Sequence, residues 1–236
     1  DVLGAINFQA PDEGTGTDAI LVAGKIDVLS EGDFSSSSNA SSMRFFTGNS
    51  AAAGTDGGSM ILSSTGNLTL KDLRTADGSS PTITLQSGDT DIAANDVLGT
   101  INFQAPDEGT GTDAILVAAG IEAVSEGDFS SSSNATKLVF KTGASAAADS
   151  KFEIASDGSV STPTAGTNNL RLGANAGNSI ASGGNENTLI GDEAGTALTT
   201  GDQNVAIGFE ALKTEDAHGR NIAIGYQALK VLDAGA

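Results

Sequence analysis

The sequence predicts an all-β fold in which elongated, β-rich modules are followed by a β-solenoid or β-roll. Two observations carry this prediction. Short apolar runs alternate with clusters of Gly, Ser, Asp and Asn, which is the pattern of strands joined by turns. Two internal repeats of different length also fill most of the chain, which is typical of proteins that grow along one direction.

The first two thirds of the chain contain a long module in two copies. Residues 96–148 repeat residues 1–53 with few differences, and the match continues beyond them after a short deletion. We therefore divide the chain into a first β-module (1–70), a connecting segment (71–95), a second β-module (96–163) and a solenoid of 17-residue repeats (164–236). Residues 91–95 have no counterpart before Asp1, so we expect the chain to be part of a longer protein.

Within the first module, each strand is expected where a short apolar run lies between turn residues. The expected strands cover residues 3–8, 19–26, 43–46, 60–62 and 68–70. The connecting segment holds one further candidate at Thr82–Leu85, and the serine run at 35–39 is expected to be a loop. Alanine stretches at 51–53 and 146–148 are compatible with single helical turns.

The C-terminal repeat begins each unit with an asparagine. Asn187, Asn204 and Asn221 are spaced by 17 residues, and an earlier unit begins at Asn169. Each unit fits one coil of a solenoid, and its asparagine would either start a turn or stack in an internal ladder with those of its neighbours. Gly208 is expected to adopt a backbone angle that other residues resist.

Two predictions concern the side chains of these units. Val205, Ile207 and the pair Ala211–Leu212 are expected to point into the coil. The segments 209–213 and 226–230 are also compatible with short helices, although each is too short to be stable alone.

Composition suggests that one chain cannot bury a large core. Leu, Ile, Val and Phe make up about 22% of the 236 residues, and the formal net charge is −19. Thin coils also leave strand edges to be covered. We therefore expect a trimeric fibre in which two identical chains complete a shared core. The residues expected to carry coil packing and the trimer core are Ile190, Val205, Ile207, Ile222 and Ile224.

The repeats resemble those of known fibre families. The 17-residue units, Asn-x-x-Ile-Gly-x-x-Ala-Leu with a Thr-Thr-Gly type of turn, resemble the head repeats of trimeric autotransporter adhesins and, more closely, related repeats of bacteriophage tail fibres. The long module, with Gly-x-Ile-Asn-Phe-Gln-Ala-Pro-Asp-Glu-Gly, resembles modules in tail-fibre proteins of marine phages and is cyanophage-like. This resemblance implies an extracellular homotrimer on the virion, with other tail proteins and a host surface glycan or protein as partners.

The leading hypothesis is therefore a structural shaft segment of a homotrimeric phage tail fibre involved in host attachment. A bacterial trimeric surface adhesin head is the first alternative. The second is a polysaccharide-degrading tail spike, which would use paired carboxylates. We expect no enzyme, because such spikes usually bind sugar on aromatic platforms and this chain has no Trp and one Tyr.

Composition also limits the ligands. With 30 acidic and 11 basic residues, the chain lacks the positive charge that phosphate contacts require, so we expect no nucleic-acid binding. No apolar run is long enough for membrane insertion. The absence of Cys excludes disulfides and cysteine-ligated zinc, and we expect no cofactor. The glycine-rich stretch 173–184 lacks the lysine of a phosphate-binding loop.

Two candidate metal sites can be named, and a solvated turn is the preferred interpretation of both. A repeated acidic loop offers oxygen ligands that suit Ca²⁺. Its carboxylates belong to Asp12, Glu13, Asp18, Asp107, Glu108 and Asp113. His218, the single histidine, could bind a metal in three copies around a three-fold axis.

Overall fold

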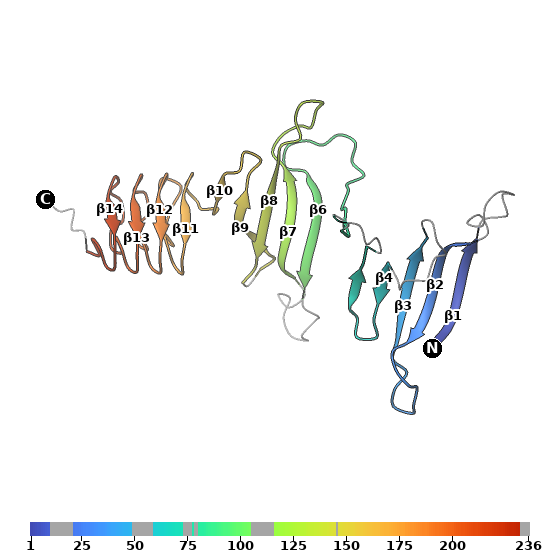
Figure 1. The fold of residues 1–236 in the computed structure, drawn as a ribbon. Helices are drawn as coiled ribbons and strands as arrows, with labels where there is room; N and C mark the ends of the chain where they lie inside the picture. The colour runs from blue at the N-terminus through green and yellow to red at the C-terminus, as the bar shows by residue number, and fades with distance from the viewer. Residues whose placement is uncertain are drawn as a thin grey trace. The chain divides into compact units, whose positions relative to one another are not determined.

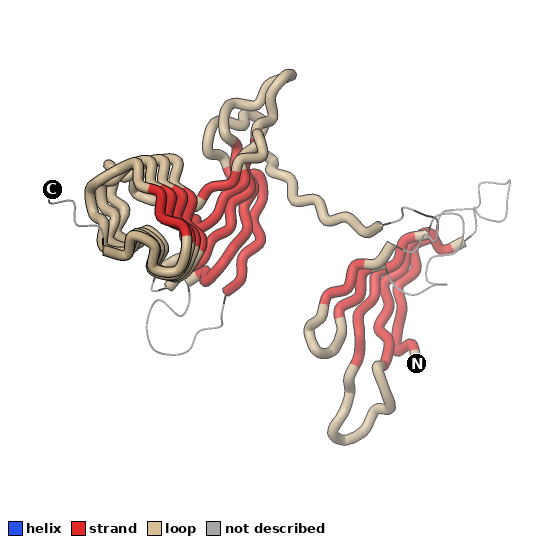
Figure 2. Tube along the Cα trace, turned by 60° about the vertical axis from the view of Figure 1, so that its left-hand side comes forward, coloured by secondary structure: helices blue, strands red, loops and turns tan. Residues whose placement is uncertain are grey.

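In the computed structural model, the residues described are 1–9, 21–48, 59–72, 77, 80–104, 116–144 and 146–231. None of these residues lies in a helix, which confirms the all-β class (Figures 1 and 2). This part of the chain accordingly has no helix suited to crossing a bilayer. The chain divides into two compact units, Asp1–Thr84 and Leu85–Ala236, and each is described by itself.

The first unit is an antiparallel sheet of five strands in chain order. Its strands are β1 (Val2–Gln9), β2 (Val22–Ser30), β3 (Ser41–Thr47), β4 (Met60–Leu62) and β5 (Leu68–Leu70). Each strand pairs with the next along the chain, as expected for apolar runs joined by local turns.

The second unit begins with a sheet of the same design. Its strands are β6 (Val97–Gln104), β7 (Val117–Ser125), β8 (Thr136–Thr142), β9 (Asp149–Ile154) and β10 (Val160–Ser161), again antiparallel and in chain order. Both copies carry two register shifts in the first strand pair, between Val2 and Gly4 and between Phe8 and Gln9 in the first copy. The duplicated sequence therefore reproduces the irregularities of the ladder as well as its strands.

The 17-residue repeats form a stack of four coils, each contributing one strand to a parallel sheet. These strands are β11 (Leu170–Leu172), β12 (Thr188–Ile190), β13 (Val205–Ile207) and β14 (Ile222–Ile224). They pair in register, so equivalent residues of successive coils lie side by side. Figure 2 shows the coils superposed almost end-on.

An asparagine ladder runs through the stack, as one of the two sequence interpretations predicted. The side-chain Oδ1 of Asn204 accepts from the backbone N–H and Nδ2 of Asn221, each at 3.0 Å. Asn204 donates in the same way to Asn187, and Asn187 donates to Asn169. Asn187 and Asn204 are fully buried, so the hydrogen bonds that join Asn169, Asn187 and Asn204 are protected from water.

The turn after each strand requires unusual backbone angles. Gly208 has φ +127°, and a Cβ there would lie 2.5 Å from the carbonyl oxygen of Gly225 in the next coil. The predicted role of Gly208 is thus confirmed. The competing helical interpretation of 209–213 is wrong, because Glu210 and Leu212 both have positive φ and the segment is a turn. Residues 226–230 are likewise not helical, for the same reason.

Two further local expectations are wrong. Residues 82–85 do not pair as a strand in the structure, and residues 146–148 form no helical turn. Strand candidates need a neighbouring ladder to satisfy their backbone groups, and the described residues offer none to Thr82–Leu85. Residues 51–53 lie outside the described residues.

The buried apolar cluster lies inside the coils and consists of small residues and leucines. Its members are Ala176, Ile180, Leu189, Ala194, Leu198, Ala206, Ala211, Leu212 and Ala223. Ala211 and Leu212 therefore point inward as predicted. Val205 and Ile207 do not, because successive side chains of a strand alternate and the middle residue, Ala206, faces inward.

Replacing the central ladder residue should destabilise the coil stack. Asn204→Ala leaves the N–H and Nδ2 of Asn221 without their acceptor, and each unsatisfied buried group costs about 1–3 kcal/mol. We expect a loss of about 2–3 kcal/mol in the free energy of unfolding, measured from urea midpoints at unchanged m-value. Asn178→Ala, at an exposed turn position of the same stack, should change it by less than about 0.5 kcal/mol. Equal effects of the two substitutions would contradict a structural role for the ladder.

Candidate functional site: apolar sheet faces without a covering layer

One face of the first sheet is apolar across all five strands. Residues directly opposite one another on antiparallel strands share a face. One cross-strand row consists of Ile6, Ile26, Phe45, Met60 and Leu70. The next row on that face consists of Gly4, Val28, Met43, Leu62 and Leu68. We call the surface formed by these two rows the first apolar face.

This face is open to solvent within its own unit. Ile6 and Leu68 are each 60% exposed and Met43 is 44% exposed, while Ile26 and Phe45 are half-buried. Burying a side chain of this size contributes about 1.5–3 kcal/mol to the free energy of folding. Two rows that stay exposed do not make this contribution. Apolar patches of this extent mark interaction surfaces.

The second sheet presents the same surface. Ile101, Ile121, Phe140 and Phe152 form one cross-strand row, and Phe140 meets Phe152 edge to face with centroids 5.7 Å apart. Gly99, Ala123, Leu138, Ile154 and Val160 form the neighbouring row. Both copies of the module therefore keep one apolar face, although several of the residues differ.

The coil stack carries a third apolar surface on the outside of its parallel sheet. Leu172, Ile190, Ile207 and Ile224 align in one row, and Leu170, Thr188, Val205 and Ile222 in the other. This surface contains all five residues predicted to form coil packing and a trimer core. They do not fill the coil: Ile222 and Ile224 are 69% and 64% exposed, and the other three are half-buried. Their role in a trimer stays a prediction.

The opposite face of the first sheet is polar and contains the most buried charge of the unit. Arg44 donates to Asp27 through two hydrogen bonds of 2.8 Å, and the Nζ of Lys25 lies 2.8 Å from the same carboxylate. Lys25 and Arg44 also lie over the ring of buried Phe46. Burial raises the pKa of Asp27, but the hydrogen bonds from Arg44 and Lys25 outweigh it and hold the pKa below the ordinary value.

The second copy achieves a similar pairing with different residues. Glu122 stands in place of Asp27, Val139 in place of Arg44, and Lys141 in place of Phe46. Lys141 donates to Glu122 at 2.9 Å, and Lys137 donates to Glu153 at 3.1 Å. The charges have moved along the strands, yet they stay on the face opposite the apolar rows.

The coils are further joined by ion pairs at their turns. Glu210 accepts from Lys213 of its own coil and from Lys230 of the next, each at 2.6 Å, and Lys213 also bonds Glu193 of the preceding coil. The hydrogen bonds from Lys213, Lys230 and Gln227 lower the pKa of Glu210 to about 2. Those from Glu193 and Glu210 raise the pKa of Lys213 to about 12.

Both metal sites stay predictions, and ligand atoms of Glu215, Asp216 and His218 lie within 4.8 Å of one another. The six carboxylates of the repeated acidic loop lie outside the described residues. His218 is exposed, and its Nδ1 lies 2.8 Å from Oε1 of buried Glu215, near Asp216. That oxygen also accepts from the backbone N–H groups of Ala217 and His218. Burial raises the pKa of Glu215, but these hydrogen bonds lower it overall, so the group serves as a turn cap.

Sequence reasoning named residues of the coil strands but placed Val205 and Ile207 inside the coil, and it missed the apolar rows of the two modules. The signal was present in the alternation Lys25-Ile26-Asp27-Val28, which places charged and apolar side chains on opposite faces. The partner rows could not be assigned, because they depend on the register between strands.

Comparisons with known proteins are sparse. No family model matches the chain, and no curated protein matches it. One solved structure with some likeness is the carboxy-terminal domain of the bacteriophage T5 L-shaped tail fibre with its intra-molecular chaperone domain. It has 16% identity and a TM-score of 0.29, and the match covers 70% of this chain and 55% of that one. A second structure of that carboxy-terminal domain has 14% identity and a TM-score of 0.28, covering 70% and 80%. At these TM-scores the likeness carries no argument.

Removing the buried charge should change how the first sheet responds to acid. A carboxylate whose folded pKa is lowered stabilises the fold above its unfolded pKa, about 3.9, and this contribution is lost as the pH falls through the folded value. Above pH 5, Asp27→Asn should lower the free energy of unfolding by about 2 kcal/mol. This loss is smaller than for a fully buried ion pair because Lys25 and Arg44 are partly exposed. In this variant the free energy of unfolding, measured from urea midpoints, should also fall less steeply between pH 5 and 2 than in the wild-type chain. Asp33→Asn, at an exposed loop position, should leave the free energy of unfolding and its pH dependence unchanged.

Proposed function

We propose that the chain is a structural shaft segment of a homotrimeric phage tail fibre, carried outside the cell on the virion tail and involved in host attachment. The observation that carries the proposal is the exposure of apolar rows on all three sheets, while charged groups lie buried on the opposite face of the first sheet. A chain that functioned alone would leave these rows in water, at a cost that association removes.

Association of three chains would turn each apolar face into one wall of a shared core. The outer row of the coil stack is continuous from coil to coil, so it offers a strip that a second chain can follow along several repeats. The resemblance of the 17-residue units to repeats of trimeric fibres supports the number three. With a charge of −19 on each chain, the acidic residues would face solvent and the apolar rows would face the axis.

The proposed mechanism is mechanical. The repeats set the length of the segment, and cooperative packing of three chains provides its stiffness. The partners of this segment would be two identical chains, other tail proteins of the virion and, at the host, a surface glycan or protein. The proposal includes no catalytic step and no cofactor.

A charge in the outer strip of the coils should separate the chains without unfolding them. Ile222 is already exposed in the single chain, so Ile222→Asp should leave the β-sheet circular dichroism intact. It should convert the trimer seen by light scattering into monomers, because three carboxylates would meet in an apolar core. Asn178→Asp, which adds the same charge at an exposed turn, should leave the trimer intact. A wild-type chain that is monomeric at micromolar concentration would overturn the trimer.

Labelling of virions tests the assignment to a tail fibre. Antibodies raised against residues 1–236 should decorate the tail fibres in electron micrographs of the phage that encodes the chain. Pre-incubation with these antibodies should also slow phage adsorption to the host. Decoration of a bacterial surface in the absence of phage would instead identify an adhesin.

A further inference from the structure

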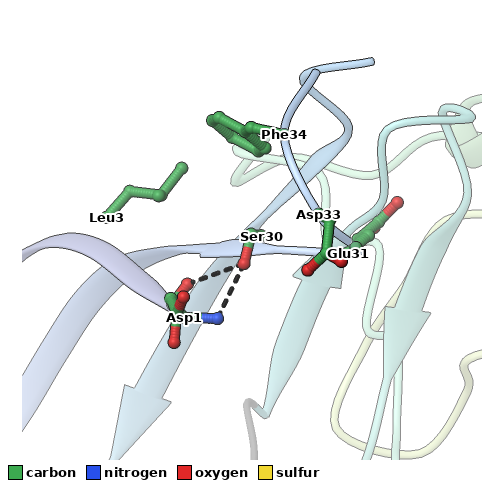
Figure 3. Close-up of a pocket in the computed structure, with 7 residues that line it drawn as sticks. Asp1, Leu3, Ser30, Glu31, Asp33 and Phe34 are labelled. Carbon is green, nitrogen blue, oxygen red and sulfur yellow. Dashed lines mark hydrogen bonds between the residues drawn. The ribbon is translucent and has the colours of Figure 1, made fainter.

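A pocket of the first module is open at a place that a segment of the chain covers in the second module. Its lining residues are Asp1, Leu3, Ser30, Glu31, Gly32, Asp33 and Phe34. In Figure 3, Leu3 and Phe34 lie over the contact between Asp1 and Ser30, with Glu31 and Asp33 beside it. All seven residues recur unchanged, 95 positions later, in the second module. The two copies therefore form a matched pair for comparison.

In the second module this place is filled by the chain that leads into the first strand of the sheet. We call residues 85–95 the strap. The carbonyl oxygen of Ile92 accepts from the backbone N–H of Phe129 at 2.9 Å, and that of Ala93 accepts from the hydroxyl of Ser125. Asn95 donates to the carbonyl of Ser125 at 2.9 Å.

The strap also covers apolar surface. Leu85 lies against Gly99 closely enough that a Cβ on that glycine would come within 2.9 Å of the leucine Cβ. At the equivalent glycine of the first module, Gly4, a Cβ would meet nothing within 4 Å. The same backbone position is thus covered in one copy and open in the other.

The exposure of identical residues reports the same difference. Leu3 is 49% and Phe34 50% exposed, whereas their counterparts Leu98 and Phe129 are half-buried. Ser125 is fully buried and Ser30 is not. Among the described residues, no acceptor is bonded to the N–H of Phe34, although its counterpart Phe129 is paired.

The hydrogen bonds at the rim are already in place. The amino group of Asp1 donates to the hydroxyl of Ser30 at 2.7 Å, as the backbone N–H of Asp96 donates to that of Ser125 at 2.9 Å. The Asp1 carbonyl accepts from the N–H of Ser30, as that of Asp96 does from Ser125. An extended segment joined to Asp1 would therefore enter the pocket along the path taken by the strap.

From this comparison we propose that the pocket of the first module is a docking site for an extended strap of the same chemistry, joined directly to Asp1. Such a segment needs free backbone carbonyls for Phe34 and Ser30, an isoleucine at the position of Ile92, and small residues between it and Asp1. Its binding would bury Leu3 and Phe34 and complete the module as the second copy is completed.

The test appends a copy of residues 85–95 before Asp1 of the full chain and follows amide hydrogen exchange by mass spectrometry. Peptides that extend to Met43 or to Leu138 distinguish the two modules, whose loops are otherwise identical. Exchange around Phe34 should slow by about tenfold or more, towards that of Phe129, which serves as the internal reference. The matched control carries the same extension with the isoleucine that corresponds to Ile92 replaced by Asp, and should show no protection.

Three outcomes would overturn the proposal. The first is exchange around Phe34 that does not respond to the extension, and the second is equal protection by the extension and its aspartate control. Protection in the unextended chain that rises with protein concentration would show instead that a second copy fills the pocket. The comparison of the extended chain with its aspartate control does not depend on whether the chain forms trimers, which light scattering of the same samples reports separately.

Discussion

An antiparallel sheet whose two faces differ in polarity needs a second layer over its apolar face, and the described part of this chain provides none for its first sheet. The rows through Ile26 and Val28 run across five strands, and the ion pairs of Asp27 lie on the opposite face. Burial of such rows is the main favourable contribution to folding. The proposed association of chains, the placement of the charges and the proposed fibre role all follow from this missing layer.

The coil stack meets the same constraint differently. Each coil folds a small core of its own, so Ala206 and Ala223 are buried without help from another chain. Polar groups inside are satisfied by the asparagine ladder, which repeats one hydrogen-bond pattern from coil to coil. The isoleucines and valines of the coil strands lie outside, whereas the buried cluster combines alanines with Leu189, Leu198, Leu212 and Ile180.

Both copies of the duplicated module keep an apolar face and a charged face, although the residues that form them differ. The apolar rows persist although Met60 is replaced by Phe152, and the charge pairing persists although Arg44 and Phe46 become Val139 and Lys141. The pocket residues are unchanged, and in the second copy they are covered by the strap. Identical local sequence thus adopts the same backbone in both copies, while its exposure depends on the segment that precedes it.

The sequence by itself determined the β-class, the two repeats and the special backbone at Gly208, because each depends on local pattern or on a fixed spacing. It left two roles open for the repeated asparagines, a turn start or a ladder, and the structure shows the ladder. Only the tertiary structure decided that Ala206 faces inward and Ile207 outward, since strand alternation leaves two choices and the burial of Ala206 shows which one the coil adopts. It also decided which residues form each cross-strand row and that residues 82–85 are not a strand. Those features depend on register and on neighbours distant in the chain, which no local pattern specifies.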